Sequence, residues 1–217
     1  MSCAATDKSA ANQVAGLKRH HLRMPHVEPG QAIGLFGGSF NPPHEGHVHV
    51  SEQALRRLDL AQVWWLVTPG NPLKNNSNLA SLQDRIAACE QINTDPRIKV
   101  TGCELNLPTR YTADTLAHIV GRNPGIRFVW VMGADNLGQF HKWERWRDIA
   151  RLMPIAVVDR PGSTLALHSA MAAQALRHAR IDEADSRRLA DYRAPAWVFL
   201  HGPRNSLSST AIRAQKK

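Results

Sequence analysis

Two histidines at the start of a predicted helix have the spacing of an anion-binding pair. His44 and His47 stand three residues apart, which places both on one face of the helix. The N-terminus of a helix presents unpaired N–H groups and a partial positive charge, so phosphates bind there readily. Two imidazoles at that point add donors aimed at the same anion. The pair therefore predicts a phosphate site rather than two incidental surface histidines.

The residues around this pair support the same interpretation. Gly37 and Gly38 end a short apolar run, where missing side chains would let a ligand approach the backbone and let the chain turn freely. Pro42 and Pro43 stiffen the approach to the helix. A metal site is the rival interpretation, but a third histidine, His49, lies on a different helical face. We therefore expect no metal ligands in this protein.

A second candidate phosphate-binding element lies near the C-terminus. Ser208 or Ser209 can cap a new helix, which leaves N–H groups and hydroxyls pointed at an anion. Arg213 follows about one turn later and can give a forked, permanently charged contact to phosphate. Alone, the pattern is that of an ordinary capped helix. Combined with the histidine pair, it indicates a second set of phosphate ligands.

Other polar residues follow predicted strands. Lys74 lies in a loop from which it could reach a triphosphate, and Arg160 could reach a phosphate in the same way. Asp135 ends a strand, where a carboxylate can accept hydrogen bonds from ribose hydroxyls. Exposed lysines and arginines are usually only solvated, so each of these cations also has an ordinary explanation.

Two tryptophans follow Asp135. Trp143 and Trp146 are three residues apart and share a face of a predicted helix over 143–152. Core packing accounts for Trp146, whereas Trp143 could pack in the core or stack on a heteroaromatic ring. Thr112 is expected to cap a further helix.

Alternating strands and helices must position these residues. Apolar runs and amphipathic segments predict an α/β fold with a doubly wound, mainly parallel sheet in a single domain. Ligands of such sheets bind beyond the carboxyl ends of the strands, near the switch point of strand order. The expected strands are 31–37, 62–68, 97–102, 126–132, 154–159 and 196–200, and the expected helices are 44–58, 80–92, 112–120, 143–152, 165–180 and a short one from 208.

Length and composition bound the remaining classes. The chain of 217 residues suits one domain, with residues 1–30 as a poorly ordered extension and 31–217 as the domain. Deleting residues 1–28 should then leave folding and activity nearly intact. No run approaches the roughly 20 apolar residues of a membrane span, and no secretory core is evident. Three cysteines without paired spacing indicate free thiols in a reducing cytoplasm.

The motifs resemble a known superfamily. The segment 34–47 is similar to the nucleotidyltransferase signature that ends in F-[DN]-P-x-H-x-G-H, with Asn41 where many members have Asp. The segment 205–213 resembles the I-S-S-T-x-I-R element that closes over the ATP phosphates, with Leu207 for the usual Ile. The order and spacing of all motifs resemble the bacterial nicotinate-nucleotide adenylyltransferases over residues 32–163 and 196–213. An insertion at 164–195 lies outside the resemblance.

This resemblance implies roles for individual residues in a Rossmann-like nucleotidyltransferase fold. The implied catalytic residues are His44, His47, Lys74 and Arg213. Those implied to bind ATP or its adenylyl half are Gly37, Gly38, Ser39, Phe40, Asp135, Arg160, Ser208 and Ser209. Those implied to surround the nicotinate ring are Tyr111, Thr112, Trp143 and Glu144.

The implied reaction is adenylyl transfer from ATP to nicotinate mononucleotide, which releases pyrophosphate. Mg²⁺ should accompany ATP, held largely by phosphates and water rather than by a protein cage. Another phosphorylated acceptor such as phosphopantetheine is the alternative substrate. An RNA-binding protein on the same fold is a third possibility, but it needs a contiguous basic stripe with stacking aromatics. The formal charge of +9 is dispersed, so we expect no nucleic acid partner and no membrane partner. Self-assembly is not predicted either way.

Overall fold

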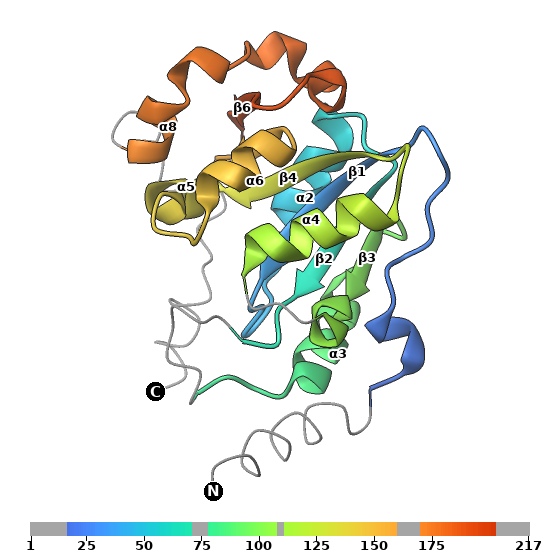
Figure 1. Ribbon diagram of the computed structural model, residues 1–217. Coiled ribbons are helices and arrows are strands. Elements are labelled where there is room, and N and C mark those ends of the chain that lie inside the picture. The colour runs from blue at the N-terminus through green and yellow to red at the C-terminus, as the bar shows by residue number, and fades with distance from the viewer. Residues whose placement is uncertain (1–16, 71–77, 108–110, 160–169, 203–217) are drawn as a thin grey trace, which may run out of the picture.

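A six-stranded parallel sheet forms the centre of the molecule. The computed structural model describes residues 17–70, 78–107, 111–159 and 170–202. The strand order is β3-β2-β1-β4-β5-β6, and every hydrogen-bonded pair of strands is parallel. Successive strands therefore extend outward from β1 on one side and from β4 on the other, which confirms the doubly wound sheet (Figure 1). The strands are β1 (Ala32–Gly38), β2 (Gln62–Val67), β3 (Ile98–Thr101), β4 (Arg127–Gly133), β5 (Ile155–Val158) and β6 (Trp197–Leu200).

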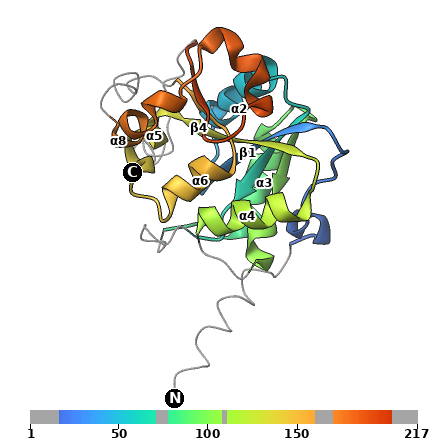
Figure 2. The ribbon, with the colours of Figure 1, turned by 45° about the horizontal axis from the view of Figure 1, so that its top comes forward.

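Helices cover both faces of this sheet. The α-helices of the described chain are α2 (Glu45–Arg57), α3 (Leu82–Ile92), α4 (Thr112–Arg122), α5 (Ala134–Phe140), α6 (Trp146–Leu152) and α8 (Met171–Ala175). Short 3₁₀ turns accompany them: η1 (Arg19–Leu22), η2 (Cys103–Asn106), η3 (Arg177–Ala179) and η4 (Glu183–Asp191). Helices α4 and α6 lie on the opposite side of the strands from α2 (Figure 2).

Two of the predicted helices differ from the structure. The predicted helix 143–152 begins only at Trp146, because the chain turns at Arg145, whose φ of 55° is left-handed. A helix that the sequence pattern did not predict, α5, precedes that turn. The predicted helix 165–180 is broken: its described part contains α8 and then η3, separated by Leu176. The predicted helix from 208 lies outside the described residues.

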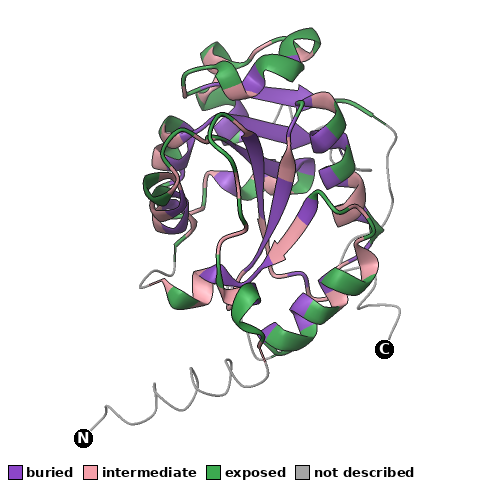
Figure 3. Cartoon of the chain, turned by 90° about the vertical axis from the view of Figure 1, so that its right-hand side faces the viewer, coloured by how far each residue is buried: buried purple, intermediate pink, exposed green. Residues whose placement is uncertain are grey.

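The core consists of two apolar clusters that share the strands. Leu35 and Phe36 are neighbours on β1, yet they point to opposite faces because side chains alternate along a strand. One cluster is completed by α4, α5, α6 and α8, and the other by α2, α3 and η4. Figure 3 shows that the strands are largely buried, with β3 partly buried in its middle, while the helices expose their outer faces. One sheet therefore serves both halves of a single-domain core.

The segment before β1 packs on the domain. The His21 side chain is buried, and its Nε2 lies 2.8 Å from a Glu90 carboxylate oxygen on α3. The Thr101 hydroxyl donates to the backbone oxygens of His21 and Arg23, and the Gly102 N–H also donates to His21. Residues 17–30 therefore differ from the loosely ordered extension that their composition suggested. Their capacity to pack depends on donors at Thr101 and Gly102 and on the Glu90 carboxylate of α3, and the composition of the segment does not reveal these partners.

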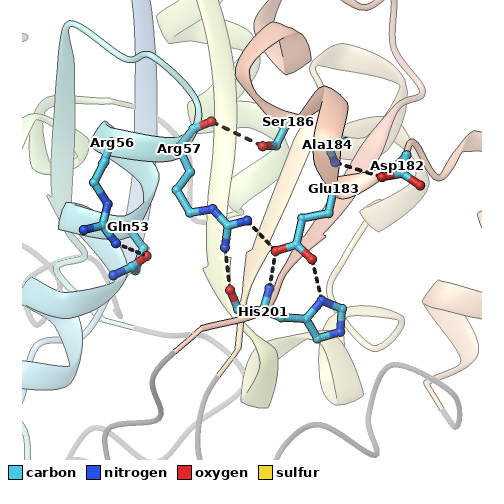
Figure 4. A network of polar contacts seen from close by, with 8 residues as sticks. All are labelled: Gln53, Arg56, Arg57, Asp182, Glu183, Ala184, Ser186 and His201. Atoms are coloured by element: carbon cyan, nitrogen blue, oxygen red, sulfur yellow. Dashed lines mark hydrogen bonds and ion pairs between the residues drawn. The ribbon is translucent and has the colours of Figure 1, made fainter.

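The described part of the insertion closes against α2 and β6. The Glu183 carboxylate on η4 accepts hydrogen bonds from the Arg57 guanidinium and from the backbone N–H of His201, and it also contacts the His201 ring (Figure 4). Arg57 in turn donates to the His201 carbonyl. The end of α2, the insertion and the residue after β6 are therefore joined at one point.

The described residues contain neither a membrane-spanning helix nor a disulfide bond. None of their helices is long and apolar enough to cross a membrane. Cys89 and Cys103 are free thiols in the core. Burial raises the pKa of both thiols, that of Cys103 to about 11, so neither is a reactive thiolate at neutral pH.

Candidate active site

The two histidines form a reciprocal cap at the start of α2. His44 is the N-cap residue, and its Nδ1 accepts a hydrogen bond from the Gly46 N–H at 3.1 Å. His47 Nδ1 accepts from the His44 backbone N–H at 3.2 Å, and the two ring centroids lie 3.9 Å apart. In a neutral imidazole whose Nδ1 is an acceptor, the proton resides on Nε2. The helix cap therefore makes Nε2 a donor in both rings, which is the form that an anion requires.

The loop between β1 and α2 turns at Phe40 rather than at a glycine. Phe40 has a left-handed φ of 46°, and its buried ring stacks on Trp65 with the centroids 5.0 Å apart. A Cβ on Gly37 would lie 2.6 Å from the Trp130 ring, and one on Gly38 would lie 3.2 Å from the Phe40 ring. The two glycines thus make room for aromatic side chains. The expectation that they let the chain turn was wrong, because both glycines lie within β1 and the left-handed residue of the turn is Phe40.

Asn41 fastens the same loop to the residues before α3. Its side-chain amide donates to the Asn78 carbonyl at 3.0 Å, and its Oδ1 accepts from the Ala80 N–H at 3.3 Å. A carboxylate could only accept. The amide that this chain has in place of the more frequent aspartate therefore makes a donor contact that Asp could not make.

Strands β1 and β4 part at the edge where the histidines lie. Their ladder ends at the pair Leu35 and Trp130, three residues before each strand ends. By contrast, β1 stays paired with β2 as far as Gly38, and β4 stays paired with β5 as far as Gly133. The switch point of strand order thus coincides with diverging strand ends, which is where this class of sheet binds ligands.

Asp135 lies on the other side of this switch point. It is an exposed residue in the first turn of α5, two residues beyond the end of β4. The starts of α2 and α5 are therefore at the same edge of the sheet. Because β1 pairs with β4, the segments that carry His44, His47 and Asp135 follow neighbouring strands of the sheet.

Trp143 lies in the turn between α5 and α6. It therefore does not share a helical face with Trp146, contrary to the sequence-based expectation, because the helix starts three residues later. Its partly buried ring packs edge-on against Trp130 and Phe140, at centroid distances of 6.1 and 5.5 Å. Trp146 is a core residue, as expected. Glu144 is exposed beside Trp143.

An ion pair brings the predicted nicotinate-binding segments together. Asp114, in the first turn of α4, pairs with Arg145, which directly follows Trp143 and Glu144. Tyr111 is the N-cap residue of α4 and is 42% exposed, whereas Thr112 is the first helical residue. The expected capping role of Thr112 is therefore wrong.

A partly buried carboxyl group also lies beside this helix. Glu104 on η2 accepts a hydrogen bond from the Thr115 hydroxyl at 2.8 Å. Burial raises the pKa of the Glu104 carboxyl, although hydrogen bonds from Thr115 and Thr68 partly offset this rise. Sequence reasoning did not identify Glu104, because its neighbours come from β2 and α4.

Arg85 on α3 is the second residue that the sequence pattern did not single out. It is only 2% exposed, and burial lowers its pKa to about 10, so it stays protonated at neutral pH. A signal was present: Arg85 occupies the apolar face of its helix together with Leu82, Ile86 and Cys89. A cation on such a face is rarely buried without a specific partner.

Several predicted residues lie outside the described parts of the chain, and the structure does not test them. These residues are Lys74, Arg160, Ser208, Ser209 and Arg213.

One group of side chains in the described chain could hold a metal ion. The potential ligand atoms of His20, His21 and Glu90 lie within 4.8 Å of one another. The group belongs to η1 and α3 and contains none of the residues considered above for phosphate or nucleotide binding. His21 and Glu90 already satisfy each other by a hydrogen bond.

The sequence is similar to a known protein family and to named relatives. The cytidylyltransferase-like family matches residues 35–215. A protein of Agrobacterium fabrum is 63% identical over 185 residues, which are 85% of this chain and 99% of the relative. One of Mesorhizobium japonicum is 59% identical over 194 residues, which are 89% of this chain and all of the relative. Both carry the name "Probable nicotinate-nucleotide adenylyltransferase". The chain belongs to the nicotinate-nucleotide adenylyltransferase family.

Solved structures of nicotinic acid mononucleotide adenylyltransferase from Plasmodium falciparum have the same fold. The complexes of that protein with APC and with NaAD each align with a TM-score of 0.62 over 85% of this chain and 83% of theirs. Sequence identity is 17% and 18%, so the likeness concerns the fold. It confirms the Rossmann-like sheet that was expected for a nucleotidyltransferase.

Proposed function

We propose that this protein transfers the adenylyl group of ATP to nicotinate mononucleotide, which forms nicotinate adenine dinucleotide and pyrophosphate in NAD biosynthesis. The observation that carries the proposal is the reciprocal histidine cap at the switch point, which provides two Nε2–H donors at a helix N-terminus. The names of relatives about 60% identical to this chain support the choice of acceptor. We further propose that the reaction takes place in the cytoplasm, where ATP is available as the substrate.

The chemistry follows from charge and position. A 5′-phosphate oxygen of the mononucleotide attacks the α-phosphorus of ATP, and the bond from that phosphorus to the bridging oxygen breaks. Pyrophosphate leaves with the electron pair. Because the nucleophile is already an anion, no general base is needed. Catalysis is then mainly positioning and stabilisation of the charge that grows on the phosphoryl oxygens.

Donors at the start of α2 would stabilise that charge. In this proposal, His44 and His47 donate through Nε2, and the N-terminus of α2 adds its partial positive charge. Lys74 and Arg213 would neutralise the departing pyrophosphate, and Arg160, Ser208 and Ser209 would hold ATP, as proposed from their motifs. Gly37, Gly38, Ser39 and Phe40 would line the phosphate approach, and Asp135 would accept from ribose hydroxyls.

The acceptor would bind on the α4 and α6 side of the switch point. Trp143 would stack on the nicotinate ring, with Tyr111, Thr112 and Glu144 around it. This placement is supported by the ion pair between Asp114 and Arg145, which joins the start of α4 to the turn that contains Trp143.

Magnesium would enter with ATP. The groups at the start of α2 are hydrogen-bond donors and imidazoles, whereas Mg²⁺ prefers oxygen ligands. These groups are therefore consistent with a Mg²⁺ ion that would be held by the ATP phosphates and water and would neutralise phosphate charge. The protein's own part is then to hold the phosphate oxygens.

An acceptor comparison tests the proposal. The protein is incubated with ATP and Mg²⁺, alone and with nicotinate mononucleotide, its nicotinamide counterpart or phosphopantetheine. We expect pyrophosphate to appear fastest with the nicotinate acceptor and not without an acceptor. Greater turnover of phosphopantetheine would contradict the proposed substrate. Isolation of a radiolabelled adenylyl-enzyme from α-labelled ATP would contradict direct transfer.

A further inference from the structure

We propose that Arg85 is a positioning residue that holds the loops after β1 and β2 in the arrangement that ATP requires. The inference rests on the proposed function. It concerns a residue that lies behind the site and acts through the backbone of two loops.

The hydrogen bonds of Arg85 reach three separate segments. Its Nη1 donates to the carbonyl of Ser39 at 2.7 Å and to that of Thr68 at 2.8 Å. Its Nε donates to the Ala80 carbonyl at 2.9 Å, and Nη2 lies 3.4 Å from the Pro69 carbonyl. These acceptors follow β1, follow β2 and precede α3. In the described chain, every hydrogen-bond acceptor of Arg85 is a backbone carbonyl.

The choice of a guanidinium for this task has a physical reason. Only arginine offers five donors in a rigid planar fork, so one side chain can bond to several fixed carbonyls. Burying its charge among apolar neighbours such as Leu82 and Ile86 is unfavourable. An apolar side chain of similar volume would avoid that cost, but it would leave the carbonyls of Ser39, Thr68 and Ala80 without their donor. The guanidinium is therefore suited to joining the loops rather than to filling the core.

The segments that Arg85 joins lead to the proposed ATP ligands. Ser39 precedes Phe40, whose ring packs against His47 with the centroids 4.8 Å apart. Pro69 lies five residues before Lys74 in the sequence. The Thr68 N–H also donates to the Gly38 carbonyl at 3.1 Å, so the two loops form one unit around the guanidinium. A shift of about 1 Å in reacting groups can reduce a rate about 10²-fold.

Arg85→Met and Arg85→Lys test this role, with Ile86→Ala as the matched control. Ile86 is fully buried on the same face of α3, so its truncation destabilises the same packing without removing a donor. Kinetic constants are measured at a temperature where circular dichroism shows each variant folded. Affinity for a non-hydrolysable ATP analogue is measured by calorimetry.

We expect Arg85→Met to lower kcat/KM for ATP about 10-fold or more and to weaken binding of the analogue. The reason is that the loops joined by Arg85 lead to the proposed ATP ligands, so their displacement affects ATP before it affects the mononucleotide. KM for the mononucleotide should change less than about 2-fold. Arg85→Lys should show a smaller loss of the same kind, because one ammonium cannot span both loops. Ile86→Ala should keep wild-type kinetic constants despite a lower melting temperature.

The outcomes separate this inference from the proposed function. If the wild-type protein does not adenylylate nicotinate mononucleotide, the proposed function fails. If it does, but Arg85→Met behaves like Ile86→Ala, the positioning role is refuted alone. Where Arg85→Met does not fold, Arg85→Lys decides: wild-type affinity for the analogue refutes the role, and a selective loss on the ATP side supports it.

Discussion

At the scale of single residues, the cap of α2 gives each histidine two tasks. The Nδ1 atom of each ring accepts a backbone N–H, and the Nε2 atom carries the proton. A change at His47 therefore alters both the helix start and the phosphate donor. Variants can separate these effects, because only the donor bears on the transition state.

His47→Ala should lower kcat by about 10²-fold, as the loss of a donor to a developing oxyanion does. His47→Asn should lower kcat similarly but keep the thermal stability of the wild type, since a short amide can still accept the N-cap N–H. His49→Ala, on another face of the same helix, is the kinetic control. Near-normal kcat in His47→Ala, measured by pyrophosphate release, would remove the basis of the proposed mechanism.

Trp143→Ala should raise KM for nicotinate mononucleotide and leave kcat and the KM for ATP nearly unchanged. Stacking on a ring is present before and during the reaction, so its loss removes uniform binding. Trp143 also packs on Trp130 and Phe140, so some loss of stability is expected. Trp143→Phe should retain part of both properties. An unchanged KM in a folded Trp143→Ala would show that the side chain serves only the core.

At the scale of elements, the insertion acts as a fastening between α2 and β6. Glu183 is the centre of this contact, and its pKa is lowered. Burial alone would raise the pKa, but hydrogen bonds from His201 and Arg57 outweigh that effect. A depressed carboxyl pKa means that the stabilisation is complete above the unfolded-state value near 4.5 and is lost as pH falls through the folded-state value.

Glu183→Gln should therefore reduce the free energy of unfolding by about 1–2 kcal/mol at pH 7, as expected for lost charge-assisted hydrogen bonds. The difference from wild type should shrink as the pH falls below about 4.5. Urea unfolding at pH 7, 5 and 3.5 measures it. Glu144→Gln, at an exposed carboxylate, controls for the change of net charge. A difference that stays constant with pH would contradict the assigned role of the Glu183 charge.

The segment before β1 should contribute to stability as well. Deleting residues 1–28 removes the acceptors at His21 and Arg23 for the buried Thr101 hydroxyl and the Gly102 N–H. We expect a loss of about 2–4 kcal/mol, because buried donors without partners each cost about 1–3 kcal/mol. This replaces the expectation that the deletion is harmless. Deleting residues 1–16 keeps all of these contacts and is the matched control, with chemical unfolding as the measurement.

At the scale of the whole molecule, both apolar clusters depend on the same strands. Leu35→Ala in one cluster and Leu55→Ala in the other should each cost about 2–5 kcal/mol. Both should shift one common unfolding transition, with tryptophan fluorescence and circular dichroism coinciding. Transitions that separate in either variant would show that the two faces unfold independently.

The sequence by itself determined the features that depend on neighbouring residues. All six strands were predicted close to their observed bounds, because each shows a short apolar or alternating pattern that is local in the sequence. The placement of His44 and His47 at the start of α2 was also predicted, since three-residue spacing and a helix start are properties of one segment. The doubly wound sheet followed from the alternation of strands and helices.

Only the tertiary structure decided which segments meet. The divergence of β1 from β4 and the contacts of Arg85 with the loops after β1 and β2 involve residues distant in sequence. The turn at Trp143 likewise depends on Arg145, whose partner Asp114 lies on another helix. Local propensity does not specify such contacts, because they gain their free energy from packing and hydrogen bonds that exist only once the chain has closed into its sheet.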